Sequence, residues 1–117
     1  MKKIALLTIL FLACGLLTMA ASPAVGSWDC VVHADMDYSF TLIIAEADGV
    51  LTAKGEARDF EVGPVEKINL EDNVLTFTID NPMAGIVDFK ATLDGDTMKG
   101  TFDTYDFGGE FTGTLQK

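Results

Sequence analysis

Residues 75–98 read LTFTIDNPMAGIVDFKATLDGDTM. Apolar residues alternate with polar ones over 75–79 and again over 87–93, and this period of two predicts two half-buried β-strands. The irregular segment between them is centred on Met83. Asp94-Gly95-Asp96 follows and is typical of a tight turn, because these residues tolerate positive φ. The stretch therefore predicts a strand, a long loop, a strand and a tight turn.

The same unit of about 23 residues occurs four times along the chain. Its first strand carries an apolar residue at near-constant spacing, namely Trp28, Leu51, Leu75 and Met98. Its long loop carries a second in-phase set, namely Met36, Phe60, Met83 and Phe107. Tight-turn pairs mark the joins at Asp48-Gly49, Asp72-Asn73 and Asp94-Gly95. A repeated hairpin that cannot bury its apolar face alone predicts a closed or stacked β architecture.

We therefore predict an all-β fold, an eight-stranded up-and-down antiparallel barrel built from four repeated hairpins. Closure of the barrel would leave no free edge, with tight turns at one end and long loops at the other. The second unit is the least regular, because Pro64 lacks an N–H donor and Glu66 shares the inward face of Ile68. A β-bulge or an edge-like opening near Pro64 would resolve both problems.

Large and small residues share the predicted interior. Phenylalanines such as Phe77 and Phe111 face it together with Gly55, Gly100 and Gly113. Small residues opposite large ones favour a solid core in so short a chain. The alternative is a narrow apolar cavity near the loop end.

The N-terminus is typical of an export signal. Lys2 and Lys3 precede an apolar run, and small residues follow it at Ala20 and Ala24, where a leader peptidase would cut. We predict a signal peptide helix over 1–24, a barrel domain over 25–117 and an exported product, periplasmic or secreted. A lipoprotein linked through Cys14 is the minor alternative, because Phe11-Leu12-Ala13-Cys14-Gly15 only loosely matches a lipobox.

Charge and cysteine content limit the partners. All 18 acidic residues follow the leader, whereas Lys2 and Lys3 of the eight basic residues belong to it, so the predicted mature chain carries six basic residues and a net charge of −12. Such a surface repels nucleic acid and anionic lipid, so neither nucleic acid nor stable membrane insertion is expected. Cleavage leaves Cys30 as the single cysteine, which excludes an internal disulfide.

No catalytic or metal constellation is expected. His33 is the only histidine and falls on the outer face, so a surface role is favoured over a metal ligand. Ser27 and Ser39 have no other base for a hydrolytic triad, and Cys30 falls on the inward face as inert packing. Asp94 and Asp96 fit turn chemistry better than calcium binding. We therefore expect no catalytic residue, no metal and no cofactor.

The loop end is the candidate ligand-binding site. Each long loop carries one Met or Phe, and these four residues either fold back as a plug or form a rim that grips an apolar ligand or a partner protein. The residues predicted to form this ligand-binding rim are Met36, Phe60, Met83 and Phe107. A weaker candidate is the outward trio Val31, Ile43 and Ala45, which would be a dimer or partner patch.

Three segments resemble short exported bacterial β-barrels of the lipocalin-like kind. These are Gly26-Ser27-Trp28-Asp29, the run from Asp94 to Thr101, and Phe111-Thr112-Gly113-Thr114. Such barrels stand alone or are appended to amidohydrolase-type enzymes, and the resemblance implies the fold and export but no defined activity. The loop tips depart from it, since only Pro82-Met83 keeps the family's Pro-Met form.

Two functions follow as expectations. The first is a non-catalytic exported binding module for a small apolar ligand at the loop end. The second is a structural or interaction module that docks on another exported protein, and the chain is then a monomer or a weak dimer. An enzyme is disfavoured because no acid, base and nucleophile converge.

Overall fold

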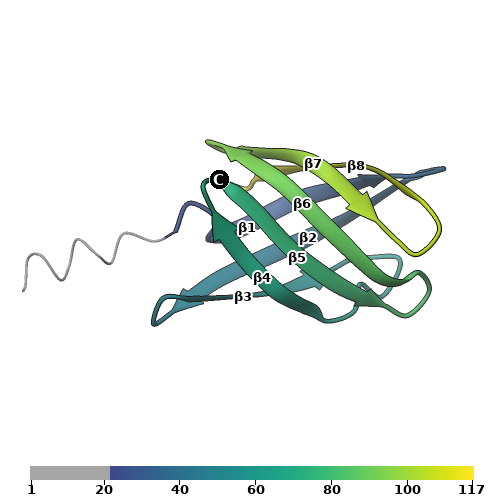
Figure 1. Ribbon diagram of the computed structural model, residues 1–117, viewed down its shortest axis with the longest axis horizontal. Helices are drawn as coiled ribbons and strands as arrows, with labels where there is room; N and C mark the ends of the chain where they lie inside the picture. Colours follow the sequence, from purple (N-terminus) through teal and green to yellow (C-terminus); the bar gives the residue numbers. More distant parts are fainter. Residues whose placement is uncertain (1–21) are drawn as a thin grey trace, which may run out of the picture.

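The computed structural model describes residues 22–117, all of whose regular elements are β-strands. The predicted leader lies almost wholly outside these residues. Eight antiparallel strands form one sheet in the order β3-β2-β1-β8-β7-β6-β5-β4, curled into a barrel (Figure 1). The strands are β1 (Gly26–His33), β2 (Asp37–Ala47), β3 (Val50–Glu56), β4 (Val65–Glu71), β5 (Val74–Asn81), β6 (Gly85–Asp94), β7 (Thr97–Asp103) and β8 (Gly108–Leu115).

The predicted all-β class, the strand count and the antiparallel order along the chain are confirmed. The first and last strands pair along their length, with Trp28 opposite Leu115 and His33 opposite Glu110. The prediction that the barrel closes completely, with no free edge, is wrong. Within residues 22–117, β3 and β4 are the two ends of the sheet and meet at a single bridge between Lys54 and Pro64. We call this junction the β3–β4 seam.

A β-bulge in β4 explains why the second unit is irregular. The register with β5 shifts between Glu66 and Asn69, and Lys67 adopts φ 56°. The extra residue changes the phase of the strand, so Val65 and Ile68 both pack toward the core while Glu66 is exposed. The β-bulge, one of the two predicted alternatives, is therefore present close to Pro64. Pro64 itself bridges to Lys54, and the two strands separate only beyond this bridge, toward the tight turns.

The tight turns have the predicted backbone. Asp48 and Gly49 have φ of 53° and 79°, and Asp72 and Asn73 have 53° and 65°. Two consecutive positive φ values match the right-handed twist of the flanking strands. All tight turns lie at one end of the barrel and all long loops at the other (Figure 1).

The barrel interior is filled by side chains. Phe89 stacks on Phe77 with ring centroids 4.6 Å apart and meets the edge of Phe111 at 4.9 Å. A Cβ on Gly113 would lie 2.8 Å from Met98 Cγ, and one on Gly55 would lie 2.5 Å from a Val62 methyl. Large side chains thus occupy the space that the glycines leave, as the solid-core interpretation requires.

A short turn covers the tight-turn end. The Val25 N–H donates to the Ser22 carbonyl at 3.0 Å across Pro23 and Ala24, which is a β-turn with proline at its favoured position. Ala24 is fully buried, and its carbonyl accepts the Trp28 Nε1–H at 2.9 Å. Trp28 is itself fully buried, as predicted.

Candidate functional site

The four predicted rim residues lie on four separate loops at the same end of the barrel. Met36 and Met83 project into solvent with 60% and 91% of their surface exposed. Phe107 is half-exposed, and its ring meets the edge of Phe102 at 6.0 Å. Phe60 is partly buried and meets the edge of Tyr38 at 6.1 Å. The two methionine side chains therefore point into solvent, whereas the two phenylalanine rings pack against aromatic residues of the barrel.

Sequence reasoning missed three further apolar residues at this end, Tyr38, Ile86 and Tyr105. Residues 22–117 present seven large exposed apolar side chains, and Val50 is the one that lies beside a tight turn. The other six gather at the loop end. Tyr105 is fully exposed two positions from Phe107, and Tyr38 continues the inward alternation of Phe40 and Leu42. This alternation in the sequence could have identified Tyr38 as a residue of the loop end.

Asn81 fixes two neighbouring loops to one another. Its Oδ1 accepts the backbone N–H groups of Met83 and Ala84 at 2.9 and 2.8 Å. Its Nδ2 donates to the carbonyl oxygens of Glu61 and Val62, both at 3.1 Å. One side chain thus shapes the Met83 loop and ties it to the loop that carries Phe60.

The other two loops are held by local polar contacts. Asp35 Oδ1 accepts the Met36 N–H at 2.9 Å, and the Ala34 N–H donates to the Met36 carbonyl at 3.2 Å. In the last loop, Thr104 Oγ1 accepts the Phe107 N–H at 3.1 Å, and the Thr104 N–H donates to the Phe107 carbonyl at 2.7 Å. Fixed backbones reduce the ordering cost of binding through the exposed side chains.

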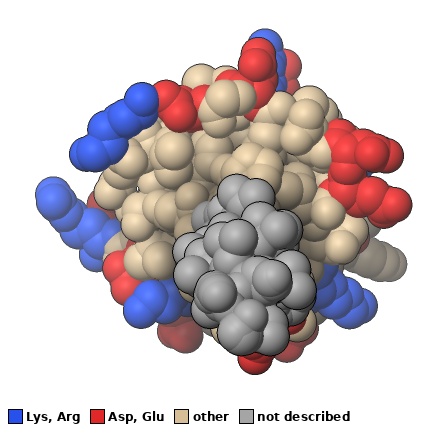
Figure 2. Space-filling view, turned by 90° about the vertical axis from the view of Figure 1, so that its left-hand side faces the viewer, with Lys and Arg blue, Asp and Glu red and all other residues tan. Residues whose placement is uncertain are grey.

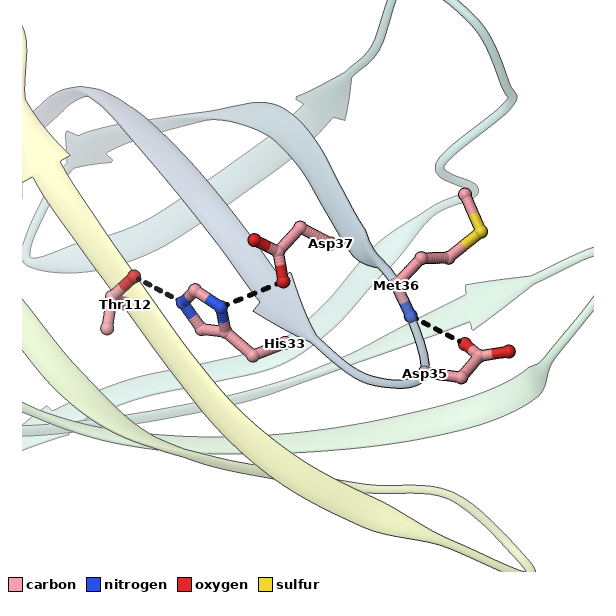
Figure 3. A network of polar contacts seen from close by, with 5 residues as sticks. All are labelled: His33, Asp35, Met36, Asp37 and Thr112. Atoms are coloured by element: carbon pink, nitrogen blue, oxygen red, sulfur yellow. Dashed lines mark hydrogen bonds and ion pairs between the residues drawn. The ribbon is translucent and has the colours of Figure 1, made fainter.

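His33 joins three strands at the base of the Met36 loop (Figure 3). Its Nδ1 lies 3.0 Å from Asp37 Oδ1 on β2, and its Nε2 lies 3.2 Å from Thr112 Oγ1 on β8. The predicted surface position of His33 holds, since about a third of its side chain is exposed. Its two partners were not anticipated, because Thr112 is 79 positions away.

The carboxylate, imidazole and hydroxyl of this network have the connectivity of a hydrolytic triad. A triad also needs N–H donors for an oxyanion. Thr112 lies within β8, with Val31 of β1 on one side and Lys99 of β7 on the other. The backbone N–H groups around Thr112 are therefore used in strand pairing. The arrangement is suited to holding the three strands together.

Cys30 lies inward, as predicted. It is 1% exposed, and its Sγ lies 3.7 Å from the Trp28 carbonyl oxygen. Burial, together with the nearby Asp29 carboxylate, raises the pKa of the Cys30 thiol to about 12, against the opposing effect of a hydrogen bond from the Leu42 backbone. A thiol with this pKa is protonated at neutral pH and is not a nucleophile.

Two hollows lie on the barrel exterior. One of about 570 Å³ borders the β3–β4 loop beside Phe60, between Gly55 and Pro64. The other, of about 430 Å³, lies over β5, β6 and β7 and is lined by Thr76, Thr78, Lys90, Thr101 and neighbouring charged residues. The first joins the loop end, and the second lies on the polar outer face.

The weaker sequence candidate does not form a patch. The register places Val31 opposite Ser39 and Ile43 opposite Ser27. Asp29 and Thr41, which face one another, therefore lie between them.

Across residues 22–117, no three His, Cys, Asp or Glu side chains are grouped for metal binding. That part of the chain also has no helix long and apolar enough to cross a membrane.

Comparisons of the chain with protein-family models, with curated proteins and with solved structures found no match.

Proposed function

We propose that the protein is an exported, non-catalytic β-barrel that binds an apolar ligand through its loop end. The observation that carries this proposal is the gathering of six of the seven large exposed apolar side chains at one end. Large exposed apolar side chains that gather in one region of a surface often mark a binding site. The lipocalin-like resemblance, the four-hairpin repeat and the export signal are consistent with it.

The ligand would contact Met36, Phe60, Met83 and Phe107, with Tyr38 and Tyr105 beside them. Thioether and aromatic side chains suit adaptable apolar recognition. The hollow beside Phe60 is a shallow depression open to solvent that adjoins these side chains. Because hydrogen bonds fix the loops, the exposed side chains are arranged before the ligand arrives.

The test is the double variant Met36→Ser/Met83→Ser, with uncharged N-phenyl-1-naphthylamine as the probe. Both side chains are largely exposed, so we expect the melting temperature to change by less than about 2 °C. We expect probe affinity to fall at least tenfold. Val50→Ser is the matched control, since it removes an exposed apolar side chain from the opposite end, and it should leave affinity unchanged.

A large fall in melting temperature with unchanged probe binding would show that the methionines serve packing. Equal loss of binding in the double variant and in Val50→Ser would show that the probe has no defined site. Either result contradicts the proposal.

A second candidate function is docking on another exported protein. Met83 and Tyr105, at 91% and 100% exposure, extend beyond any enclosed pocket, and protein interfaces favour Met and Tyr. Native mass spectrometry of protein recovered from its own compartment separates the two functions. A bound small molecule supports the first, and a bound subunit supports the second.

A further inference from the structure

The β3–β4 seam leaves the core partly uncovered. Each of the other six strands contains at least two fully buried residues, whereas neither β3 nor β4 contains one. Leu51 and Ala53 of β3 and Ile68 and Leu70 of β4 pack against the core yet remain partly exposed. Trp28 and Leu75, at the same end of the barrel, are fully buried.

The two seam strands also present unpaired backbone. They touch at the Lys54–Pro64 bridge, on the loop side, and diverge toward the tight turns (Figure 1). Residues 50–53 of β3 pair with β2 on one edge, and residues 22–117 provide no ladder for the other edge. An unpaired edge of this kind is a template for a further strand.

Protection of this edge is uneven. Lys54, Pro64 and the bulge at Lys67 are the devices by which proteins block strand addition, and all three lie in the loop-side half or the middle of the seam. The tight-turn half of β3 reads Val50-Leu51-Thr52-Ala53. It carries no charge, and Val50 is 61% exposed.

Acidic side chains lie near the tight-turn half of the β3–β4 seam and favour a partner with basic side chains. Glu46, opposite Leu51, and Asp48 lie beside β3, and Glu71 and Asp72 end β4. All four are exposed. Viewed from this end, both acidic and basic side chains project around the periphery, with uncharged surface visible between them (Figure 2).

We propose that β3 binds an extended peptide segment of another protein, with alternate apolar and basic side chains, as an added strand along Val50–Ala53. Main-chain hydrogen bonds to β3 would supply affinity. The apolar side chains would cover Leu51, Ile68 and Leu70, and the basic ones would face Asp48, Glu71 and Asp72. This site lies at the end opposite the proposed loop-end surface and does not depend on it.

The test uses a synthetic ten-residue peptide of alternating lysine and valine, titrated into the purified barrel and followed by backbone amide NMR shifts. We expect saturable shifts at residues 50–53 and 68–71. Val50→Lys should weaken binding at least tenfold, because an edge lysine blocks strand pairing and repels the peptide. Ile86→Lys is the matched control, since it adds the same charge to an exposed strand residue at the loop end, and it should weaken binding less than twofold.

A second peptide, N-methylated at every residue so that neither edge can donate a hydrogen bond, should not bind. The proposal is overturned if the peptide does not bind at millimolar concentration, or if its shifts map to the loop end. It is also overturned if Val50→Lys and Ile86→Lys weaken binding equally, which would indicate general charge attraction. Dimerisation of the free barrel through β3 would identify a second copy as the occupant and would also overturn it.

Discussion

At the scale of single residues, a few side chains decide how the barrel ends are built. Asn81 makes four hydrogen bonds that connect two loops, and the Trp28 indole fixes the turn that covers the opposite end. Cys30 is the residue for which burial changes the chemistry most, since the pKa of its thiol is raised to about 12.

This pKa makes stability depend on alkaline pH. In the unfolded chain the thiol pKa is close to 9.0, and in the barrel it is about 12. Below pH 9 the thiol is protonated in both the folded and the unfolded chain, so its contribution to the free energy of unfolding is fully present. Between pH 9 and 12 only the unfolded chain ionises, so the free energy of unfolding should fall by up to about 1.4 kcal/mol per pH unit from this group.

Urea unfolding at pH 8, 9, 10 and 11 measures this slope. Cys30→Ala is the control, because it retains the titrating lysines and tyrosines and lacks the thiol. The variant should lose less stability than the wild type over this range. Equal slopes, or rapid reaction of Cys30 with a thiol reagent in the native state, would contradict a buried thiol.

At the scale of elements, the four strand pairs that the sequence spacing predicts to be repeats differ in their surroundings. Leu51 of β3 and Leu75 of β5 occupy corresponding positions in the predicted repeat, yet Leu75 is fully buried and Leu51 is only partly buried. β5 pairs with β4 and β6, and β3 lies at an end of the sheet. Equivalent sequence positions therefore carry different packing energies.

The matched substitutions Leu75→Ala and Leu51→Ala measure that difference. We expect Leu75→Ala to lower the free energy of unfolding by about 3–4 kcal/mol, because it leaves a cavity in closed packing. Leu51→Ala should cost about 1–2 kcal/mol, since water already reaches part of this side chain. Chemical denaturation of both variants is the measurement, and equal costs would mean that the seam is closed in solution.

The sequence predicted much of the fold, but few of the contacts between residues that are distant in the chain. Alternation identified the inward rows, and Pro64 with Glu66 located the bulge. An edge-like opening near Pro64 was one of two predicted alternatives, but the separation of β3 and β4 toward the tight turns was not predicted. Alternation records which face a residue occupies and not whether the next strand is within hydrogen-bonding distance. The contacts of Asn81 and His33 join residues up to 79 positions apart, and no local pattern encodes them.

At the scale of the whole molecule, the N-terminal turn belongs to the barrel. The predicted domain boundary between Ala24 and Val25 falls inside this turn. Ser22 also holds it, because its N–H donates to Glu46 Oε1 at 3.1 Å and its hydroxyl accepts the Ala24 N–H at 3.3 Å. Removal of Ala24 would uncover Trp28 and leave its indole N–H without a partner.

We therefore predict that the leader is removed after Ala20 and that the mature chain begins at Ala21. The intact mass of the protein purified from cells that express the full chain checks this prediction. Two purified chains provide a second check. A chain that starts at Val25 should be less stable than one that starts at Ala21 by about 1–3 kcal/mol, the cost of a buried donor without a partner. A mature N-terminus at Val25, with equal stability of the two chains, would contradict it.

The pairing of β1 with β8 sets the order of events during synthesis. Hairpins such as β1–β2 and β5–β6 can form as soon as they leave the ribosome, because their partners are adjacent in the chain. The second partner of β1, Gly108–Leu115, is made last, and this long-range closure is entropically costly and slow. We therefore expect the emerging chain to contain separate hairpins at most, and to form the β1–β8 pairing only after Gly108–Leu115 has left the ribosome.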